Sequence, residues 1–202
     1  MSRFDQRGQA ATLEAIVAAL ILLSSVVFAL QMTAVTPLSA STSSQHIENQ
    51  LEASAEGLLA TAVEDGSLKR ALLFYNNSTN VFVGADNDGY NARPPNNTFG
   101  ETLSWAFDDR GIAYNIYVEY SGSNTGRNLY YRGEPSDNAV AATTTLVVMD
   151  ETPMYHHADD DGVLEPRSYT VSQALPNSSY IPDASPGTLY NIVRVEVVVW
   201  RI

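Results

Sequence analysis

RGQAATLEAIVAALILLSSVVFAL, residues 7–30, is the stretch that decides the architecture of this chain of 202 residues. Between Ala10 and Leu30 only four side chains are polar: Thr12, Glu14, Ser24 and Ser25. About 21 helical residues at 1.5 Å per residue span roughly 30 Å, the thickness of the hydrocarbon core of a bilayer. No later segment is as long and as apolar, so the sequence predicts one membrane-compatible helix near the N-terminus.

Three kinds of segment share this pattern. A secretory signal peptide combines a charged start, a short apolar core and small residues before the cut. Arg3 and Arg7 supply the charge and Leu38–Ala40 offers a poor site for the cut, but the apolar run is long for such a core. A permanent anchor has to tolerate the carboxylate of Glu14, which is costly in hydrocarbon without a partner. A pilin-type N-terminus needs that carboxylate, because it pairs with a positive charge.

Arg7-Gly8-Gln9 before the apolar helix resembles the class III signal sequence of archaeal type IV pilin-like proteins, and Thr12–Ile16 resembles the start of a type IV pilin helix. The resemblance implies that a prepilin-peptidase-like protease cuts after Gly8. It also implies that Glu14 pairs with the new α-amino group of Gln9, in its own or a neighbouring subunit. The cut would place Glu14 sixth in the mature chain, one position later than in bacterial pilins.

We expect four segments: a leader (1–8), a transmembrane and assembly helix (9–36), an amphipathic continuation of the helix (37–66) and an exported head (67–202). The positive charges of Arg3 and Arg7 place the leader in the cytoplasm and the head outside the cell membrane. Pro37 is expected to kink or interrupt the helix. From Ser43 to Glu64 apolar residues recur at helical spacing, and Gly66 is a plausible stop.

The head is predicted to be α+β, with the N-terminal helix laid on one face of a mostly antiparallel sheet. A short helix or turn is expected over Ser67–Phe74, and a helix is expected after a capping box of Thr98 and Glu101. Residues 76–98 and 150–168 are expected to be long polar loops, the first with a short strand at Val81–Val83. The alternation of apolar and polar residues predicts the other strands: Ile112–Tyr120, Arg127–Arg132, Ala139–Met149, Ser168–Ala174 and Tyr190–Ile202.

Tyrosines gather on the predicted hairpin, at Tyr114, Tyr117, Tyr120, Tyr130 and Tyr131. Both faces of the hairpin carry them, so we expect one set in the core and the other on the surface. An exposed aromatic set would suit a contact with another subunit or an adhesive surface. Trp105 lies partly off the apolar face of its helix, where it would contact the sheet or a partner.

The composition is acidic, with a net charge of −12 and Lys69 as the one lysine among eleven basic residues. Such a surface is typical of proteins from near-saturated salt, where a Debye length of about 3 Å weakens repulsion between charges. An acidic surface protein from ordinary salt is the alternative. The charge argues against nucleic acid as a partner. The absence of cysteine excludes disulfides and cysteine-ligated zinc.

Four N-x-[ST] sequons mark possible glycosylation of an exported head, at Asn76, Asn77, Asn96 and Asn177. His156-His157 with Asp159–Asp161, and Asp86–Asp88, invite a metal site. Both acidic runs lack the final glutamate of a calcium loop, since Ser168 stands in that place for the first of them. We therefore expect no metal and no cofactor. The chain carries no motif of a nucleophile with its base, so an enzyme is not expected.

Together these patterns favour a structural subunit, a minor pilin or pseudopilin of an archaeal pilus-like or secretion-related surface assembly. Its expected partners are membrane lipid, the leader peptidase and other pilin-like subunits. One alternative is an uncleaved, single-pass anchored protein whose head binds a ligand, sugar or surface. Another is a secreted soluble protein cut near Ala40.

Overall fold

The computed structural model describes residues 3–85, 89–122, 126–159, 162–175, 180–184 and 186–202, and describes their side chains except at 3–9 and 32–44. The chain divides into two compact units, Met1–Ile47 and Glu48–Ile202. The first unit is helical, and the second is an α+β head that includes the last turns of the same helix. The predicted fold class, a long apolar helix followed by helices and antiparallel sheets, is confirmed.

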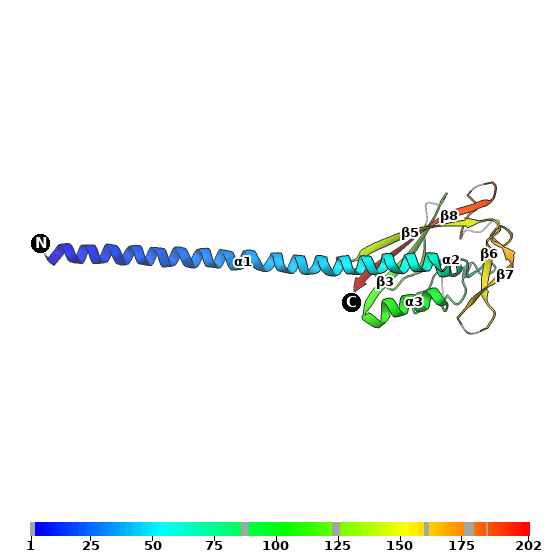
Figure 1. The fold of residues 1–202 in the computed structure, drawn as a ribbon, viewed down its shortest axis with the longest axis horizontal. Coiled ribbons are helices and arrows are strands. Elements are labelled where there is room, and N and C mark those ends of the chain that lie inside the picture. Colours follow the sequence, from blue (N-terminus) through cyan, green and yellow to red (C-terminus); the bar gives the residue numbers. More distant parts are fainter. Residues whose placement is uncertain (1–2, 86–88, 123–125, 160–161, 176–179, 185) are drawn as a thin grey trace. The chain divides into compact units, whose positions relative to one another are not determined.

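The N-terminal helix α1 extends from Arg3 to Glu64, a length of 62 residues (Figure 1). It runs through Pro37, so the interruption expected there is absent. Proline removes one backbone donor from a helix interior. The remaining backbone hydrogen bonds of this long helix keep the backbone helical at Pro37.

The last turns of α1 bury an apolar stripe in the head. It contains Leu51, Leu58, Leu59 and Ala62, at the predicted spacing, and also Ala55. Two residues after the helix ends, Gly66 adopts the left-handed region with φ 73°. Helix α2 (Ser67–Leu72) begins directly behind it. The predicted stop and the predicted short helix are therefore both confirmed.

Helix α3 extends from Thr98 to Ala106. It begins one residue before the start expected from an N-cap at Thr98. The N-cap is Asn97, whose Oδ1 accepts a hydrogen bond of 3.0 Å from the backbone N–H of Gly100. The expected capping box of Thr98 and Glu101 is wrong, because Thr98 is already the first helical residue. Asn97 has an extended backbone and a short side chain with an acceptor, which is what the N-cap position requires. A 3₁₀ turn, η1 (Asp108–Arg110), follows and ends at Gly111.

The main sheet has four antiparallel strands in the order β4-β3-β8-β5. Their bounds are Ile112–Tyr120 for β3, Arg127–Tyr130 for β4, Val140–Met149 for β5 and Leu189–Arg201 for β8. The predicted hairpin is the pair β3 and β4. The C-terminal strand β8 lies between β3 and β5, with four valines fully buried on one face: Val193, Val195, Val197 and Val199. Alternation over the last 13 residues therefore identified this strand, and the structure places it inside the sheet.

Strand β3 is more buried than its alternation suggested. Asn115, expected on the polar face, is fully buried. Its Nδ2 donates to the carbonyl of Gly133 at 2.8 Å and to the hydroxyl of Tyr117 at 2.9 Å, and its Oδ1 accepts from the backbone N–H of Arg132 at 2.8 Å. The segment that follows β4 thus covers this face, and the hydrogen bonds offset the cost of burying an amide.

Residues 150–168 are not the polar loop that the sequence predicted. They contain β6 (Pro153–His157) and most of β7 (Leu164–Thr170), which form an antiparallel pair. Ser168–Ala174 is not one strand either, because the capping box of Thr170 starts helix α4 (Val171–Ala174). Most side chains of β6 and β7 are partly exposed, so their polar composition resembles that of a loop.

A small sheet of β1 (Tyr75–Asn76) and β2 (Val81–Phe82) carries an aromatic cluster, and it confirms the strand predicted at Val81–Val83. The ring of Tyr180 stacks on Tyr75 at a centroid distance of 4.2 Å and meets Phe82 edge-on at 5.0 Å. The Tyr180 hydroxyl donates to the carbonyl of Leu72 at 2.8 Å. Because Tyr180 is fully buried, this cluster ties the chain before β8 to the helical side of the head.

Buried tyrosines should make the head sensitive to alkali. Burial raises the pKa of five hydroxyls above the ordinary value of about 10: those of Tyr90, Tyr114, Tyr120, Tyr180 and Tyr190. For Tyr190 the pKa rises to about 12. A raised pKa in the folded state means that the stability from these groups is complete below about pH 10 and falls as the pH rises further.

We expect phenolate absorbance from these tyrosines to appear together with loss of circular dichroism, above pH 10. Full ionisation of all eleven tyrosines near pH 10 in a folded protein would contradict this expectation.

Candidate functional sites

The apolar part of α1, Ala10–Gln31, is long and apolar enough to cross a membrane, and none of it is buried within the protein. Its large side chains are exposed: Leu13, Ile16, Val17, Leu20, Ile21, Leu22, Leu23, Val26, Val27, Phe28 and Leu30. A soluble core helix would be covered by its own chain. The segment is therefore consistent with a membrane span or a signal sequence.

Two of the polar groups in this segment are satisfied within the helix. The Ser24 hydroxyl donates to the carbonyl of Leu20 at 2.7 Å, and the Ser25 hydroxyl donates to the carbonyl of Leu22 at 2.8 Å. Both serines can therefore enter hydrocarbon at little cost. Glu14 differs, because it is exposed and no residue of Ala10–Ala18 carries a positive charge. In hydrocarbon its carboxylate would therefore need an opposite charge from outside this stretch.

The predicted leader junction, Arg7-Gly8-Gln9, lies within α1, so its backbone is helical. The side chains there are outside the described part of the structure. The junction is five residues from Glu14, less than two helical turns along α1. The predicted cleavage residue and the predicted assembly residue thus share one end of the apolar segment.

Three of the four sequon asparagines are described, and all three are exposed: Asn76, Asn77 and Asn96. Asn76 is the last residue of β1 rather than part of a loop, and its Oδ1 accepts a hydrogen bond of 2.9 Å from the backbone N–H of Ser78. Asn177 lies outside the described residues. The exposure of the three amides makes them accessible to a modifying enzyme.

The two histidines of β6 do not converge. His156 Nδ1 lies 3.1 Å from the carbonyl oxygen of Glu165, whereas His157 Nε2 lies 2.6 Å from that of Asn96. Neighbouring residues of a strand point to opposite faces, which explains their separation. Within the described residues no group of three His, Asp or Glu side chains could hold a metal ion. Asp86–Asp88, Asp160 and Asp161 lie outside that part of the chain.

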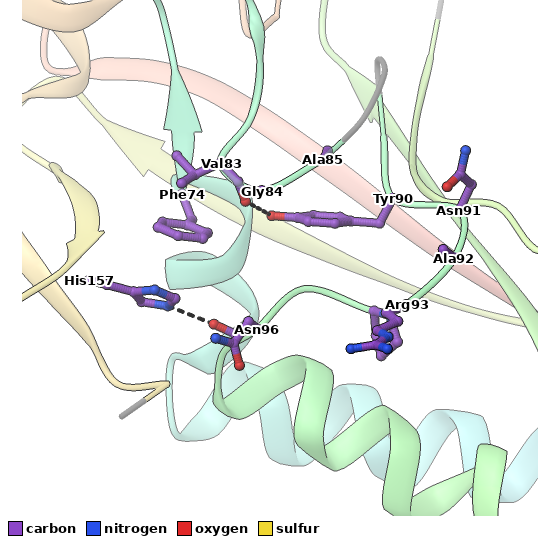
Figure 2. Close-up of a pocket in the computed structure, with 11 residues that line it drawn as sticks. Phe74, Val83, Gly84, Ala85, Tyr90, Asn91, Ala92, Arg93, Asn96 and His157 are labelled. Atoms are coloured by element: carbon purple, nitrogen blue, oxygen red, sulfur yellow. Dashed lines mark hydrogen bonds between the residues drawn. The ribbon is translucent and has the colours of Figure 1, made fainter. Parts of the chain in front are cut away.

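The head contains a pocket of about 350 Å³ that sequence reasoning missed (Figure 2). Phe74 and Tyr90 form two of its walls, and His157 lies beside Phe74 with a ring-centroid distance of 4.7 Å. The Tyr90 hydroxyl donates to the carbonyl of Val83 at 2.7 Å, which fixes that ring. Arg93 stands at the rim, across from His157 (Figure 2).

The pocket is assembled from segments that are far apart in the sequence. Phe74 precedes β1, Val83 follows β2, Tyr90 and Arg93 belong to the loop before α3, and His157 ends β6. No periodic or spaced motif connects them. The only signal available was the presence of tyrosine and arginine in the predicted loop 76–98. The size and the mainly apolar walls suit a small ligand held by a few polar groups.

The tyrosines of the hairpin separate into a buried and a partly exposed set, as expected. Tyr114, Tyr120 and Tyr130 are buried, and the rings of Tyr114 and Tyr130 stack at 4.8 Å. Tyr117 and Tyr131 are half-buried, so they form no broad exposed aromatic face.

Trp105 is the most exposed aromatic residue among the described residues of the head. Its side chain is 68% exposed, so most of its surface is uncovered. The guanidinium carbon of Arg110 lies 5.3 Å from the centroid of its ring. A contact between Trp105 and a partner remains an expectation.

These features define a class of protein: an α+β head that follows a single N-terminal helix with the properties of a membrane span or signal sequence. Within that class, the chain belongs to a family of unknown function, DUF7288, whose match covers residues 7–199. The match includes the apolar helix as well as the head. Neither a curated protein nor a solved structure matches the chain.

Proposed function

We propose that this protein is a structural subunit of an archaeal type IV pilus-like or secretion-related surface assembly, a minor pilin or pseudopilin. In this proposal a prepilin-peptidase-like protease removes residues 1–8. The helix from Gln9 onward then anchors the subunit in the membrane and packs against the helices of other subunits. The head lies outside the cell.

The observation that carries the proposal is the combination of an uncovered apolar helix with a carboxylate near its start. None of Ala10–Gln31 is buried within the protein, which supports a covering of lipid or of other helices. A lone carboxylate in that layer costs several kcal/mol, and an opposite charge offsets much of this cost. Cleavage after Gly8 would create such a charge at Gln9, close to Glu14.

The family match begins at Arg7 and includes the whole apolar segment, so it is compatible with a helix that stays in the mature subunit. The acidic, lysine-poor composition supports a halophilic source. The exposed amides of Asn76, Asn77 and Asn96 are compatible with glycosylation of an exported head.

A single-pass anchored binding protein is the second candidate, and the pocket between Phe74, Tyr90 and His157 favours it. A head with a small-ligand pocket can act at the membrane surface without polymerising. In that case the first eight residues have no reason to be removed, and Glu14 needs no partner from another subunit.

Cleavage separates the two candidates. We expect the protein extracted from membranes of the native host to begin at Gln9, as found by intact mass and N-terminal sequencing. A chain that retains residues 1–8 would favour the anchored binding protein. A soluble fragment that starts at Ser41 would contradict both and would identify a secreted protein. Excess mass on peptides with Asn76, Asn77 or Asn96 would reveal attached sugar.

A further inference from the structure

The walls of the pocket in the head are fixed by the fold. Tyr90 is held at both ends, because its hydroxyl donates to the carbonyl of Val83 at 2.7 Å and its backbone N–H donates to the carbonyl of Leu129 at 2.9 Å. The backbone N–H of Val83 donates in turn to the carbonyl of Phe74 at 3.2 Å. Two of the aromatic walls are therefore in place before any ligand enters, as is usual for ligand pockets.

The loop that leads to α3 lines another side of the pocket and is fixed as well. His157 Nε2 lies 2.6 Å from the carbonyl oxygen of Asn96 in this loop. Pro94 and Pro95 follow Arg93 and stiffen the loop, because proline locks its own φ at about −65° and restricts the residue before it to extended conformations. The backbone of Arg93 is thereby fixed at the rim, and its guanidinium is the adjustable part of the pocket (Figure 2).

Arg93 has no partner among the residues that the structure describes. Its exposed side chain makes no hydrogen bond and no ion pair with them. Two other arginines of the head differ, since Arg132 forms an ion pair with Asp108 and Arg194 forms one with Glu119. A guanidinium at the rim of a cavity, with no partner of its own in the described part of the chain, is available to a ligand.

The described lining of the pocket favours an aromatic anion. It contains the rings of Phe74, Tyr90 and His157 and no aspartate or glutamate, while residues 86–88 lie outside the described part of the chain. Aromatic rings accept another ring in offset or edge-to-face contact. The volume of about 350 Å³ is at the small end of the range for ligand pockets, which suits a molecule of one or two rings.

We propose that this pocket binds a small aromatic carboxylate, whose ring packs against Phe74 and Tyr90 and whose carboxylate pairs with the guanidinium of Arg93. The planar guanidinium offers two parallel N–H donors to the two oxygens of a carboxylate. A cationic ligand of the same shape would meet Arg93 as a like charge, and a neutral one would leave the guanidinium without an opposite charge. Charge, shape and size thus select the same class of ligand.

The proposal goes beyond the assembly through the N-terminal helix. Every residue that it uses belongs to the head, so it applies both to an assembly subunit and to an anchored binding protein. It depends neither on cleavage after Gly8 nor on Glu14. A chain that retains residues 1–8 would therefore contradict the proposed subunit and leave the ligand site untouched.

The test measures binding of 2-naphthoate, a two-ring carboxylate. The full-length chain in detergent micelles is dialysed to equilibrium against the same micelles without protein, so that partition into detergent is equal on both sides. We expect an excess of 2-naphthoate on the protein side. Binding of 2-naphthamide, which has the same rings and no charge, should be at least about tenfold weaker, because hydrogen bonds to a charged group are stronger than those to a neutral one.

Two pairs of variants locate the site. Arg93→Gln should weaken binding of 2-naphthoate at least about tenfold and leave that of 2-naphthamide unchanged. Arg201→Gln, which removes an exposed arginine of β8 that does not line the pocket, should change neither. Ala92→Phe places a larger side chain on the pocket lining and should weaken binding of both ligands. Ala141→Phe, an equal change on the exposed face of β5, should weaken neither.

Four results from protein with native circular dichroism would overturn the proposal. The first is no excess of 2-naphthoate on the protein side, and the second is equal binding of 2-naphthoate and 2-naphthamide. The third is equal binding of 2-naphthoate by Arg93→Gln and Arg201→Gln, and the fourth is equal binding by Ala92→Phe and Ala141→Phe. Binding should persist in Glu14→Ala, which separates the ligand site from helix assembly.

Discussion

Replacement of Glu14 by alanine is expected to leave the protein in the membrane but to lower its incorporation into a surface assembly at least about tenfold. Removing a charge from an apolar helix makes insertion easier, by less than the roughly 2.5–3.5 kcal/mol that insertion scales give at a helix centre, because Glu14 lies near one end of the segment. The same change leaves the α-amino group at Gln9 without an opposite charge in a layer of low dielectric, and breaking a buried ion pair costs about 3–5 kcal/mol. Comparison of membrane-bound and sheared surface fractions by immunoblot measures both effects.

The control for Glu14 is another polar residue of the same helix. Ser24→Ala also removes a polar group, but its hydroxyl already bonds to the carbonyl of Leu20 within the helix. Ser24→Ala should therefore assemble normally. Glu14→Gln tests charge apart from shape and should resemble Glu14→Ala. A normal yield of assembled protein from Glu14→Ala would remove the main argument for a pilin-like subunit.

The second large effect is expected at Gly100, in the first turn of α3. A Cβ at this position would overlap the carbonyl oxygen of Pro95 and stand 2.9 Å from its carbonyl carbon. Both atoms belong to the backbone, so no side-chain rotation can relieve the overlap. Gly100→Ala should lower the free energy of unfolding by about 3 kcal/mol, the upper end of the usual cost of overpacking. Chemical denaturation followed by circular dichroism measures it.

Gly57 is the matched control for Gly100. It also lies within a helix, α1, but a Cβ there would meet no atom within 4 Å. Alanine is more favourable than glycine in a helix interior. Gly57→Ala should therefore leave the free energy of unfolding unchanged or raise it by about 0.5–1 kcal/mol. Equal effects of the two substitutions would mean that the close approach of Pro95 to α3 is not maintained in solution.

Elements with a regular pattern were predictable from the sequence. The 22-residue segment Ala10–Gln31, the buried stripe from Leu51 to Ala62 and the valine alternation of β8 each repeat one rule over many residues. A prediction from such a repeat remains correct when one residue departs from it, because every other turn or residue pair supports the same element. The hairpin of β3 and β4 followed from the same rule.

Features fixed by a single contact were not predictable. Asn97 rather than Thr98 caps α3, because the backbone before the helix brings that amide to the N–H of Gly100. Strands β6 and β7 resembled a loop because their side chains are mostly half-exposed. The alternation of β3 placed Asn115 on the exposed face, but the segment that contains Gly133 covers this residue in the folded head.

The amino-acid sequence by itself determined that the chain carries one long apolar helix with an acid near its start, followed by an α+β head. These properties depend on composition and period, which belong to the chain before it folds. Only the tertiary structure decided which asparagine is buried and where Phe74, Tyr90 and His157 meet around a pocket. Those properties depend on contacts between segments up to 83 residues apart, from Phe74 to His157, and no local pattern encodes them.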